Sequence, residues 1–228
     1  MVKALPLCYV GFLAATTGSG CAFAPPSGTP LLPAFGLGSS ALAASTLTEK
    51  DELVLSVVLL ARTLGPVGVY NSEEEQSKLK QLADQLADFS DPAPALKSLS
   101  GRHELVYSAA PGGSSGKLFG PIFGRVTQEF VDDLTFLNAV EIGPLKLSLR
   151  AERKVMDDRV IQVSFKESIV SVFGNELIRK EIGGGGTWKY IFAGVMTDPA
   201  SGKRKLLRVM ETPSLFVIEA PVEESSIL

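Results

Sequence analysis

The sequence predicts a mainly β fold: a lipocalin-like antiparallel β-barrel preceded by two N-terminal α-helices. Two patterns of hydrophobicity carry this prediction. Between residues 49 and 91, apolar residues recur at helical spacing. From about residue 100 to residue 221, apolar and polar residues alternate with a period of two, in short runs separated by turn residues. We therefore expect one domain over 49–228, with helices in 49–91 and the barrel in 100–221.

The first helix is expected to begin after Thr48. The side-chain oxygen of this residue can cap free backbone amides, and the acidic pair Asp51-Glu52 suits the positive end of a helix. Residues 53–60 are apolar on nearly every side, which favours burial over the alternative of lying against a greasy surface. Gly65-Pro66 ends the helix.

The second helix has a clearer signature. Residues 72–75 form a capping box, which begins with Ser72 and ends with Glu75. A stripe of apolar side chains then follows on one face, typical of a helix that docks on a core: Leu79, Leu82, Leu86 and Phe89. Asp91-Pro92 ends the helix, because the residue before a proline resists the helical region.

The second half of the chain is predicted to consist of strands with one dry face. The clearest alternating sets comprise Leu145, Leu147, Leu149 and Ala151; Ile161, Val163 and Phe165; and Trp188, Tyr190 and Phe192. Further strands are expected at about 102–109, 124–131, 134–141, 168–173, 175–182, 204–210 and 214–220. Some ten short antiparallel strands need closure to remove their edges, which favours a barrel; a two-sheet sandwich is the competing architecture.

Composition excludes several chemistries. Both cysteines, Cys8 and Cys21, lie in residues 1–48, which contain no acidic residue. If this leader is removed, no thiol is left for a disulfide, a thiolate nucleophile or a Cys-ligated zinc. His103 is the one histidine of the sequence, and we expect a structural or surface role for it. We expect no metal, no cofactor and, with a formal charge of −3, no binding to nucleic acid.

The leader is expected to be a targeting segment. A basic start at Lys3, an apolar run over 5–15 and the small residues of Gly20-Cys21-Ala22 predict a signal peptide over 1–22. Residues 23–48 have the composition of a disordered, transit peptide-like segment. Cys21-Ala22-Phe23-Ala24-Pro25 resembles the bipartite plastid-targeting leader of algae with red-lineage secondary plastids. An ordinary secreted protein is the alternative, and Ala41-Leu42-Ala43 leaves a thylakoid-lumen destination open.

Three other segments were considered as binding motifs. Gly112–Lys117 lacks the glycine and the Ser or Thr that a phosphate-binding loop requires, and we interpret it as a hairpin loop. Gly183–Gly186 is interpreted as a loose strand connection or, alternatively, a mobile mouth. Lys203-Arg204-Lys205 with Arg208 is a basic cluster that suits either a solvated turn or contact with anionic headgroups.

Over about residues 53–221 the chain resembles the plastid-lipid-associated protein family, the plastid fibrillins. The segments that carry the resemblance, in order, are Asp91-Pro92-Ala93-Pro94, Leu99–Ser108, Val126–Phe130, Asn138-Ala139-Val140, Val163-Ser164-Phe165 and Leu215-Phe216-Val217. Arg208 fits the arginine of the family's Leu-Arg-Ile strand. The Asp that precedes it and the Arg-Gly pair that follows it in the family are missing here, which suggests a divergent subgroup.

The resemblance implies a non-enzymatic protein that binds or coats hydrophobic lipids or isoprenoids, such as carotenoids and quinones. It implies peripheral association with thylakoids or plastoglobules. The candidate ligand-binding residues, expected to line or flank an apolar interior, are Tyr107, Leu147, Leu149, Ile161, Phe165, Trp188, Tyr190, Phe192 and Arg208. The same stripes would also suit a packed core.

Two alternatives stay open from the sequence. A bilin-chromophore lyase would use polar residues at a barrel mouth, with Arg125, Arg150 and Arg208 as candidates. A purely structural coat of lipid globules would act through the apolar helix at 53–60.

Overall fold

A computed structural model describes residues 47–110, 115–116, 123–212 and 214–222 of the chain. Residues 1–46 of the predicted targeting leader and most of the Gly112–Lys117 loop lie outside the described residues. The described residues belong to one compact unit, Ser45–Leu228.

Both predicted helices are confirmed. α1 spans Glu49–Leu64 and is capped by Thr48, whose hydroxyl accepts from the Asp51 amide at 3.2 Å. α2 spans Glu73–Gln85, and Ser72 and Glu75 form the expected reciprocal capping box. A short 3-10 turn, η2 (Leu86–Phe89), continues α2, while η1 (Gly68–Tyr70) and η3 (Pro94–Leu96) lie in the connections before α2 and before the first strand.

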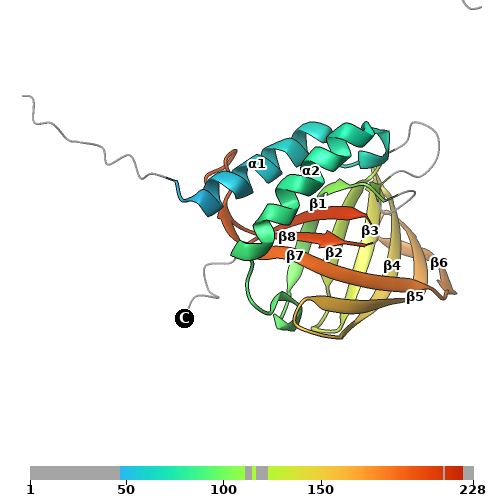
Figure 1. Cartoon of the computed structure of the whole chain (residues 1–228). Coiled ribbons are helices and arrows are strands. Elements are labelled where there is room, and N and C mark those ends of the chain that lie inside the picture. Colours follow the sequence, from blue (N-terminus) through green and yellow to red (C-terminus); the bar gives the residue numbers. More distant parts are fainter. Residues whose placement is uncertain (1–46, 111–114, 117–122, 213, 223–228) are drawn as a thin grey trace, which may run out of the picture. The chain divides into compact units, whose positions relative to one another are not determined.

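Nine antiparallel strands follow within the described ranges: β1 (Gly101–Ser108), β2 (Arg125–Phe130), β3 (Thr135–Ile142), β4 (Leu145–Val155), β5 (Val160–Val172), β6 (Asn175–Glu181), β7 (Gly185–Thr197), β8 (Arg204–Glu211) and β9 (Leu215–Pro221). All belong to one sheet, with the order β4-β3-β2-β1-β9-β8-β7-β5-β6 and an additional β4–β5 pairing. That extra pairing joins the two sides of the sheet, so eight strands form a closed ring, and the two-sheet sandwich is not observed (Figure 1).

The long strand β5 makes the closure possible. Its first part, from Val160 to Ser164, pairs with β7, and its second part, from Glu167 to Val172, pairs with β6. β4 runs along the other side of β5 over nearly its whole length. The expectation of two separate strands at 161–166 and 168–173 is therefore wrong: they are one strand with a bulge where its partner changes. β6 stands outside the ring as an exposed edge.

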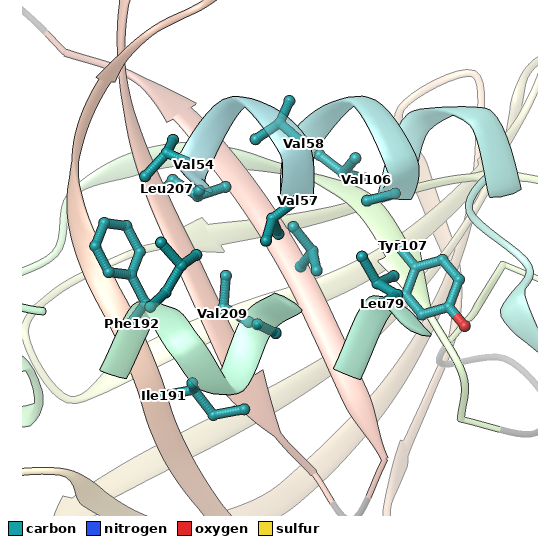
Figure 2. Close-up of a cluster of buried hydrophobic side chains, with 14 of the residues drawn as sticks. Val54, Val57, Val58, Leu79, Val106, Tyr107, Ile191, Phe192, Leu207 and Val209 are labelled. Atoms are coloured by element: carbon teal, nitrogen blue, oxygen red, sulfur yellow. The ribbon is translucent and has the colours of Figure 1, made fainter. Parts of the chain in front are cut away.

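The helices cover the outer face of one side of the ring. Their buried residues Val54, Val57, Val58, Ala61, Leu79, Ala83 and Leu86 share one cluster with outward-facing residues of β1, β7, β8 and β9 (Figure 2). We call this cluster the outer core. It explains the apolar sequence of α1, because burial of that face against the sheet stabilises the helix far more than propensity alone.

A second cluster, which we call the inner core, lies inside the ring. It contains Leu105, Phe130, Phe136, Ala151, Ile161, Val163, Trp188, Tyr190, Ala193, Met210, Phe216 and Ile218, closed by Ala95 and Leu99 from the segment around η3. A chain of tilted aromatic contacts joins Phe130 to Phe136, Phe136 to Trp188 and Trp188 to Phe216, with centroids 5.5, 5.7 and 6.1 Å apart.

A charge network fastens α1 to the ring. Arg62 of α1 donates to Asp198 at 2.7 Å and to Glu219 at 2.8 Å, and Lys205 binds the same two carboxylates at 3.0 and 2.6 Å. Burial raises the pKa of Asp198, but hydrogen bonds from Ser201, Arg62 and Lys205 outweigh that effect, and the pKa is lowered overall. Within the described ranges, no helix has both the length and the hydrophobicity to cross a bilayer.

Candidate functional site

The inner core does not fill the ring. A cavity of about 740 Å³ remains beside it, bounded by residues of β2, β3, β4, β5, β7 and β9 together with Thr212. Its lining comprises Val126, Thr127, Gln128, Asn138, Ala139, Val140, Leu147, Ser148, Leu149, Phe165, Ser168, Gly185, Gly186, Thr187, Trp188, Thr212, Phe216 and Ile218. None of these residues carries a charge, so the wall suits an uncharged hydrocarbon body.

Two carboxamides form a polar spot on this wall. Gln128 of β2 and Asn138 of β3 are direct cross-strand partners, and Gln128 Nε2 donates to Asn138 Oδ1 at 3.1 Å. On its other side, Gln128 Oε1 accepts a hydrogen bond from Arg208 Nη2 at 2.5 Å. The polar spot is therefore backed by a buried cation.

Arg208 points into the ring. Its neighbours in β8, Leu207 and Val209, lie in the outer core, so the alternation of the strand places Arg208 on the opposite face. The residue is 2% exposed, and its guanidinium lies 5.3 Å from the centre of the Phe130 ring. Burial lowers the pKa of Arg208, and the nearby Tyr190 opposes this shift.

Arg208 has no carboxylate partner among the described residues, since no ion pair within 4.0 Å involves it in that part of the chain. Its acceptors are Gln128 Oε1 and, at 3.2 Å, His103 Nδ1. Over the same described residues, Arg208 Nε and the Tyr190 hydroxyl lack a hydrogen bond of acceptable geometry. A buried guanidinium with neutral partners is rare, because desolvating a charge is costly unless an opposite charge compensates it.

His103 is neutral in this setting. Burial and the adjacent Arg208 lower the pKa of His103 to about 3. Because a guanidinium can only donate, the Nδ1 that faces it must accept, and the ring proton therefore resides on Nε2. That nitrogen lies 3.1 Å from the Ser100 carbonyl oxygen, to which it donates. His103 was expected to be a structural or surface residue, and the structure gives it a structural position: it accepts a hydrogen bond from Arg208 inside the ring.

The structure brings four of the sequence-predicted site residues together at the cavity: Leu147, Leu149, Phe165 and Trp188. Ile161 and Tyr190 lie in the inner core, next to the cavity rather than on its wall. Arg208 lies behind Gln128. Whether any of these residues binds a ligand stays a prediction.

The structure places Tyr107 and Phe192 elsewhere. Both belong to the outer core, and Figure 2 shows them beneath the helices. The cause in each case is a β-bulge: the β1–β9 register shifts between Leu105 and Tyr107, and the β7–β8 register shifts between Tyr190 and Phe192. An additional residue in a strand reverses the faces of the residues that follow, so strict alternation misplaces them.

Sequence reasoning missed Gln128 and Asn138 as site residues. Both occur in segments that carry the family resemblance. Each is a polar residue on a strand face that is otherwise apolar. A polar residue in register with inward-facing apolar ones is the signal that points to a buried partner. The matching residue is Arg208, which has two apolar residues on each side, Leu206-Leu207 and Val209-Met210.

Gly185 has a specific structural role at the cavity. Its φ is +153°, and a Cβ at this position would lie 2.0 Å from the carbonyl oxygen of Val163. β7 therefore approaches β5 closely where both strands border the cavity. The expectation that Gly183–Gly186 is only a loose connection is wrong for Gly185 and Gly186, which pair with β5.

The basic cluster is only partly free. Lys205 is held by Asp198 and Glu219, and Arg208 is inside the ring, which leaves Lys203 and Arg204 exposed. The other two arginines suggested for a lyase, Arg125 and Arg150, are solvent-exposed and lie near Glu104 and Glu167 respectively. They do not line the cavity.

These features define a class of small antiparallel β protein, in which a ring of strands encloses an apolar cavity and two helices brace one side. A family model described as PAP_fibrillin matches residues 55–218, which is more than half of the chain. The chain therefore belongs to the plastid lipid-associated (fibrillin) family. Comparison with curated proteins and with solved structures gave no match.

Proposed function

We propose that this protein is a non-enzymatic lipid carrier of the plastid, which holds a hydrophobic lipid or isoprenoid within a lipocalin-like barrel. The single observation that supports this most strongly is the uncharged cavity of about 740 Å³ inside the closed ring of strands. This volume is within the range of roughly 300–1,000 Å³ typical of small-molecule sites. Release of water from an apolar wall and an apolar ligand drives such binding.

Carotenoids and quinones are the lipid classes we propose, with Leu147, Leu149, Phe165 and Trp188 as the wall that contacts them. Membership in a lipid-associated family supports this choice.

We propose a plastid location at thylakoids or plastoglobules, reached with residues 1–22 as a signal peptide and 23–48 as a transit peptide-like segment. A fusion of residues 1–48 to a fluorescent protein tests the proposed plastid targeting: fluorescence outside the plastid would contradict it.

A specific observation favours attachment to a lipid surface as well. The hairpin between β5 and β6 exposes Phe173, Leu177 and Ile178, which are 80%, 64% and 59% exposed. Phe173 follows Val172, which pairs with Leu145, only two residues before the cavity residue Leu147. The exposed apolar tip therefore lies near one edge of the cavity wall, a suitable arrangement for a protein that exchanges lipid with a membrane.

The apolar surface of the β5–β6 hairpin differs from the surface expected to act in a pure coat protein, which is the apolar part of α1. The apolar residues of α1 at 54, 57 and 58 are buried in the outer core and are not available to a membrane. Flotation with liposomes of plastid lipids shows whether the β5–β6 hairpin or α1 attaches the protein to a lipid surface. We expect the double variant Phe173→Ser/Leu177→Ser to lose flotation and the helix variant Leu59→Ser to retain it; the reverse result would favour the coat model.

The lyase alternative has less support. Bilin propionates need cations at the ligand, and Arg125 and Arg150 are on the outside of the ring near carboxylates. Transfer of a bilin to an apoprotein by the purified protein would favour that alternative.

Extraction of lipids from protein purified from its own plastids tests the proposed function. We expect a bound lipid with a defined stoichiometry, visible by absorption if it is a carotenoid. A cavity-filling variant, Leu147→Trp, is expected to lose the lipid. Met156→Trp, in the exposed turn between β4 and β5 and away from the cavity lining, is the matched control, which should retain it. Equal lipid content in both variants would contradict binding in the cavity.

A further inference from the structure

We propose that the cavity accepts an amphiphile with a carboxylate head, of the long-chain fatty acid class, whose head lies at the Gln128–Asn138 amide pair with Arg208 as its buried counter-charge. This inference rests on the proposed function, because it adds a further class of lipid, with a charged head, to those proposed for the same cavity.

The first supporting observation is the missing counter-ion. Arg208 is 2% exposed and, among the described residues, has no carboxylate within ion-pair distance. The residues that the structure describes on the cavity wall beside it include no Asp or Glu. A net positive charge is thus enclosed next to an otherwise neutral cavity, and an anion in that cavity would interact with it across a medium of low polarity. Within the described residues, the Nε of the same guanidinium makes no hydrogen bond of acceptable geometry, and its neighbour Tyr190 carries no formal charge.

The second observation is the direction of the hydrogen bonds. Because a guanidinium has donors only, Gln128 must present its oxygen to Arg208. Its Nε2 must then face Asn138, whose Oδ1 accepts at 3.1 Å. The Nδ2 group of Asn138 is then the last donor in this series of hydrogen bonds, at the end that faces the cavity. The buried cation therefore fixes both amides so that the cavity meets an N–H group rather than an oxygen.

The two observations select the same head group. An N–H donor requires an acceptor, which excludes a pure hydrocarbon as the best ligand, and the uncompensated cation prefers an anionic acceptor to a neutral one. A carboxylate meets both requirements, while its alkyl chain contacts the apolar wall formed by Leu147, Leu149 and Phe165. A ketone or an ester meets the first requirement alone.

Head-group preference can be measured on the unmodified full chain. Palmitate, methyl palmitate and hexadecanol share one alkyl chain length and differ in the head. Their dissociation constants can be obtained by displacement of a fluorescent fatty-acid analogue. Hydrogen bonds to charged groups contribute about 1.5–3 kcal/mol, so we expect palmitate to bind about 10- to 100-fold more tightly than the two neutral lipids. Equal affinities would overturn the carboxylate inference while leaving the lipid cavity intact; no binding of any of the three would contradict the proposed function itself.

Two variants test whether the preference for palmitate depends on the Gln128–Asn138 amide pair. Asn138→Leu removes the donor and should abolish the preference for palmitate over methyl palmitate, while methyl palmitate itself still binds. Thr187→Val, elsewhere on the same wall, is the matched control and should preserve the preference. Since the readout is a ratio of two affinities within one variant, a general loss of folded protein does not imitate it. An unchanged ratio in Asn138→Leu would overturn the assignment of the head to this amide pair.

The charge of Arg208 can be probed without disturbing its position. Gln128→Glu supplies a carboxylate in place of the ligand's and is expected to remove the preference for palmitate. Carbon-13 NMR of carboxyl-labelled palmitate gives an independent readout: a carboxylate beside the buried cation should stay ionised to lower pH than palmitate in vesicles. A bound head that titrates as it does in vesicles would overturn the inference.

Discussion

The Nη2 group of Arg208 donates to the Oε1 atom of Gln128 at 2.5 Å, joining β8 to β2 across the inside of the ring. These strands are not neighbours in the sheet, so the contact bridges the interior rather than a strand pair. Gln128 is fully buried, and its amide is the main acceptor that the buried guanidinium has.

Loss of this acceptor should be costly. Among the described residues, Gln128→Leu leaves the buried charge with His103 as its remaining hydrogen-bonded side-chain acceptor, and we expect the free energy of unfolding to fall by about 2–4 kcal/mol. Gln128→Glu has nearly the same shape and supplies an opposite charge, so it should be clearly more stable than Gln128→Leu. Chemical denaturation of the three proteins measures this order. Equal stabilities for the Leu and Glu variants would show that Arg208 does not need an acceptor there.

His103 makes stability depend on pH. Its pKa is about 3 in the folded protein and near 6.5 in the unfolded chain, so the unfolded state takes up a proton first as the pH falls. The contribution of His103 is complete above about pH 6.5 and is lost progressively down to about pH 3, with a slope of about 1.4 kcal/mol per pH unit. Denaturation at pH 7, 6 and 5 measures the slope. His103→Gln keeps an acceptor for Arg208 and should remove this part of the slope; an identical slope would assign it to other groups.

Arg62 is expected to hold α1 in place. Arg62→Met keeps most of the aliphatic stem but leaves Asp198 and Glu219 with Lys205 as their shared cation. Because the network is partly exposed, we expect a loss of about 1–2 kcal/mol. Hydrogen exchange of α1 amides should increase as well. Arg102→Met, which breaks a separate ion pair with Glu141 of β3 and leaves the Arg62 network intact, is the control and should leave α1 protection unchanged.

Gly185 should be irreplaceable at the seam between β5 and β7. A Cβ in Gly185→Ala would meet the Val163 carbonyl oxygen at 2.0 Å, so the two strands must separate next to the cavity. We expect a loss of about 2 kcal/mol or more, together with weaker lipid binding. Gly183→Ala is the matched control, since nothing lies within 4 Å of a Cβ there. Similar stability of both variants would contradict the close approach.

Much of the fold could be predicted from local patterns. The capping residues Thr48 and Ser72 fix the helix starts because their hydroxyls bond to amides three residues away. Alternation located the strands, and their antiparallel order made closure the natural expectation. What could not be predicted is where alternation fails. The bulges before Tyr107 and Phe192 depend on the partner strands β9 and β8, so no single segment reveals them.

The polar residues of the site could not be predicted from the sequence for a related reason. Arg208, Gln128 and His103 are far apart in the sequence and meet only because β1, β2 and β8 face one interior. Each of them alone is a polar residue on a strand, with no local pattern that identifies its partner. Leu147, Leu149, Phe165 and Trp188 could be predicted because apolar alternation needs no knowledge of what lies opposite.

If a lipid enters the ring, the protein contains its own fluorescent reporter of that event. Trp188 is the one tryptophan of the sequence and lies on the cavity wall. Titration with a fatty acid brominated along its chain measures proximity, because bromine quenches indole fluorescence only at close range. A lipid inside the cavity predicts strong, saturable quenching at one equivalent, reversed by unbrominated fatty acid. Quenching no greater than that of free tryptophan would contradict the account.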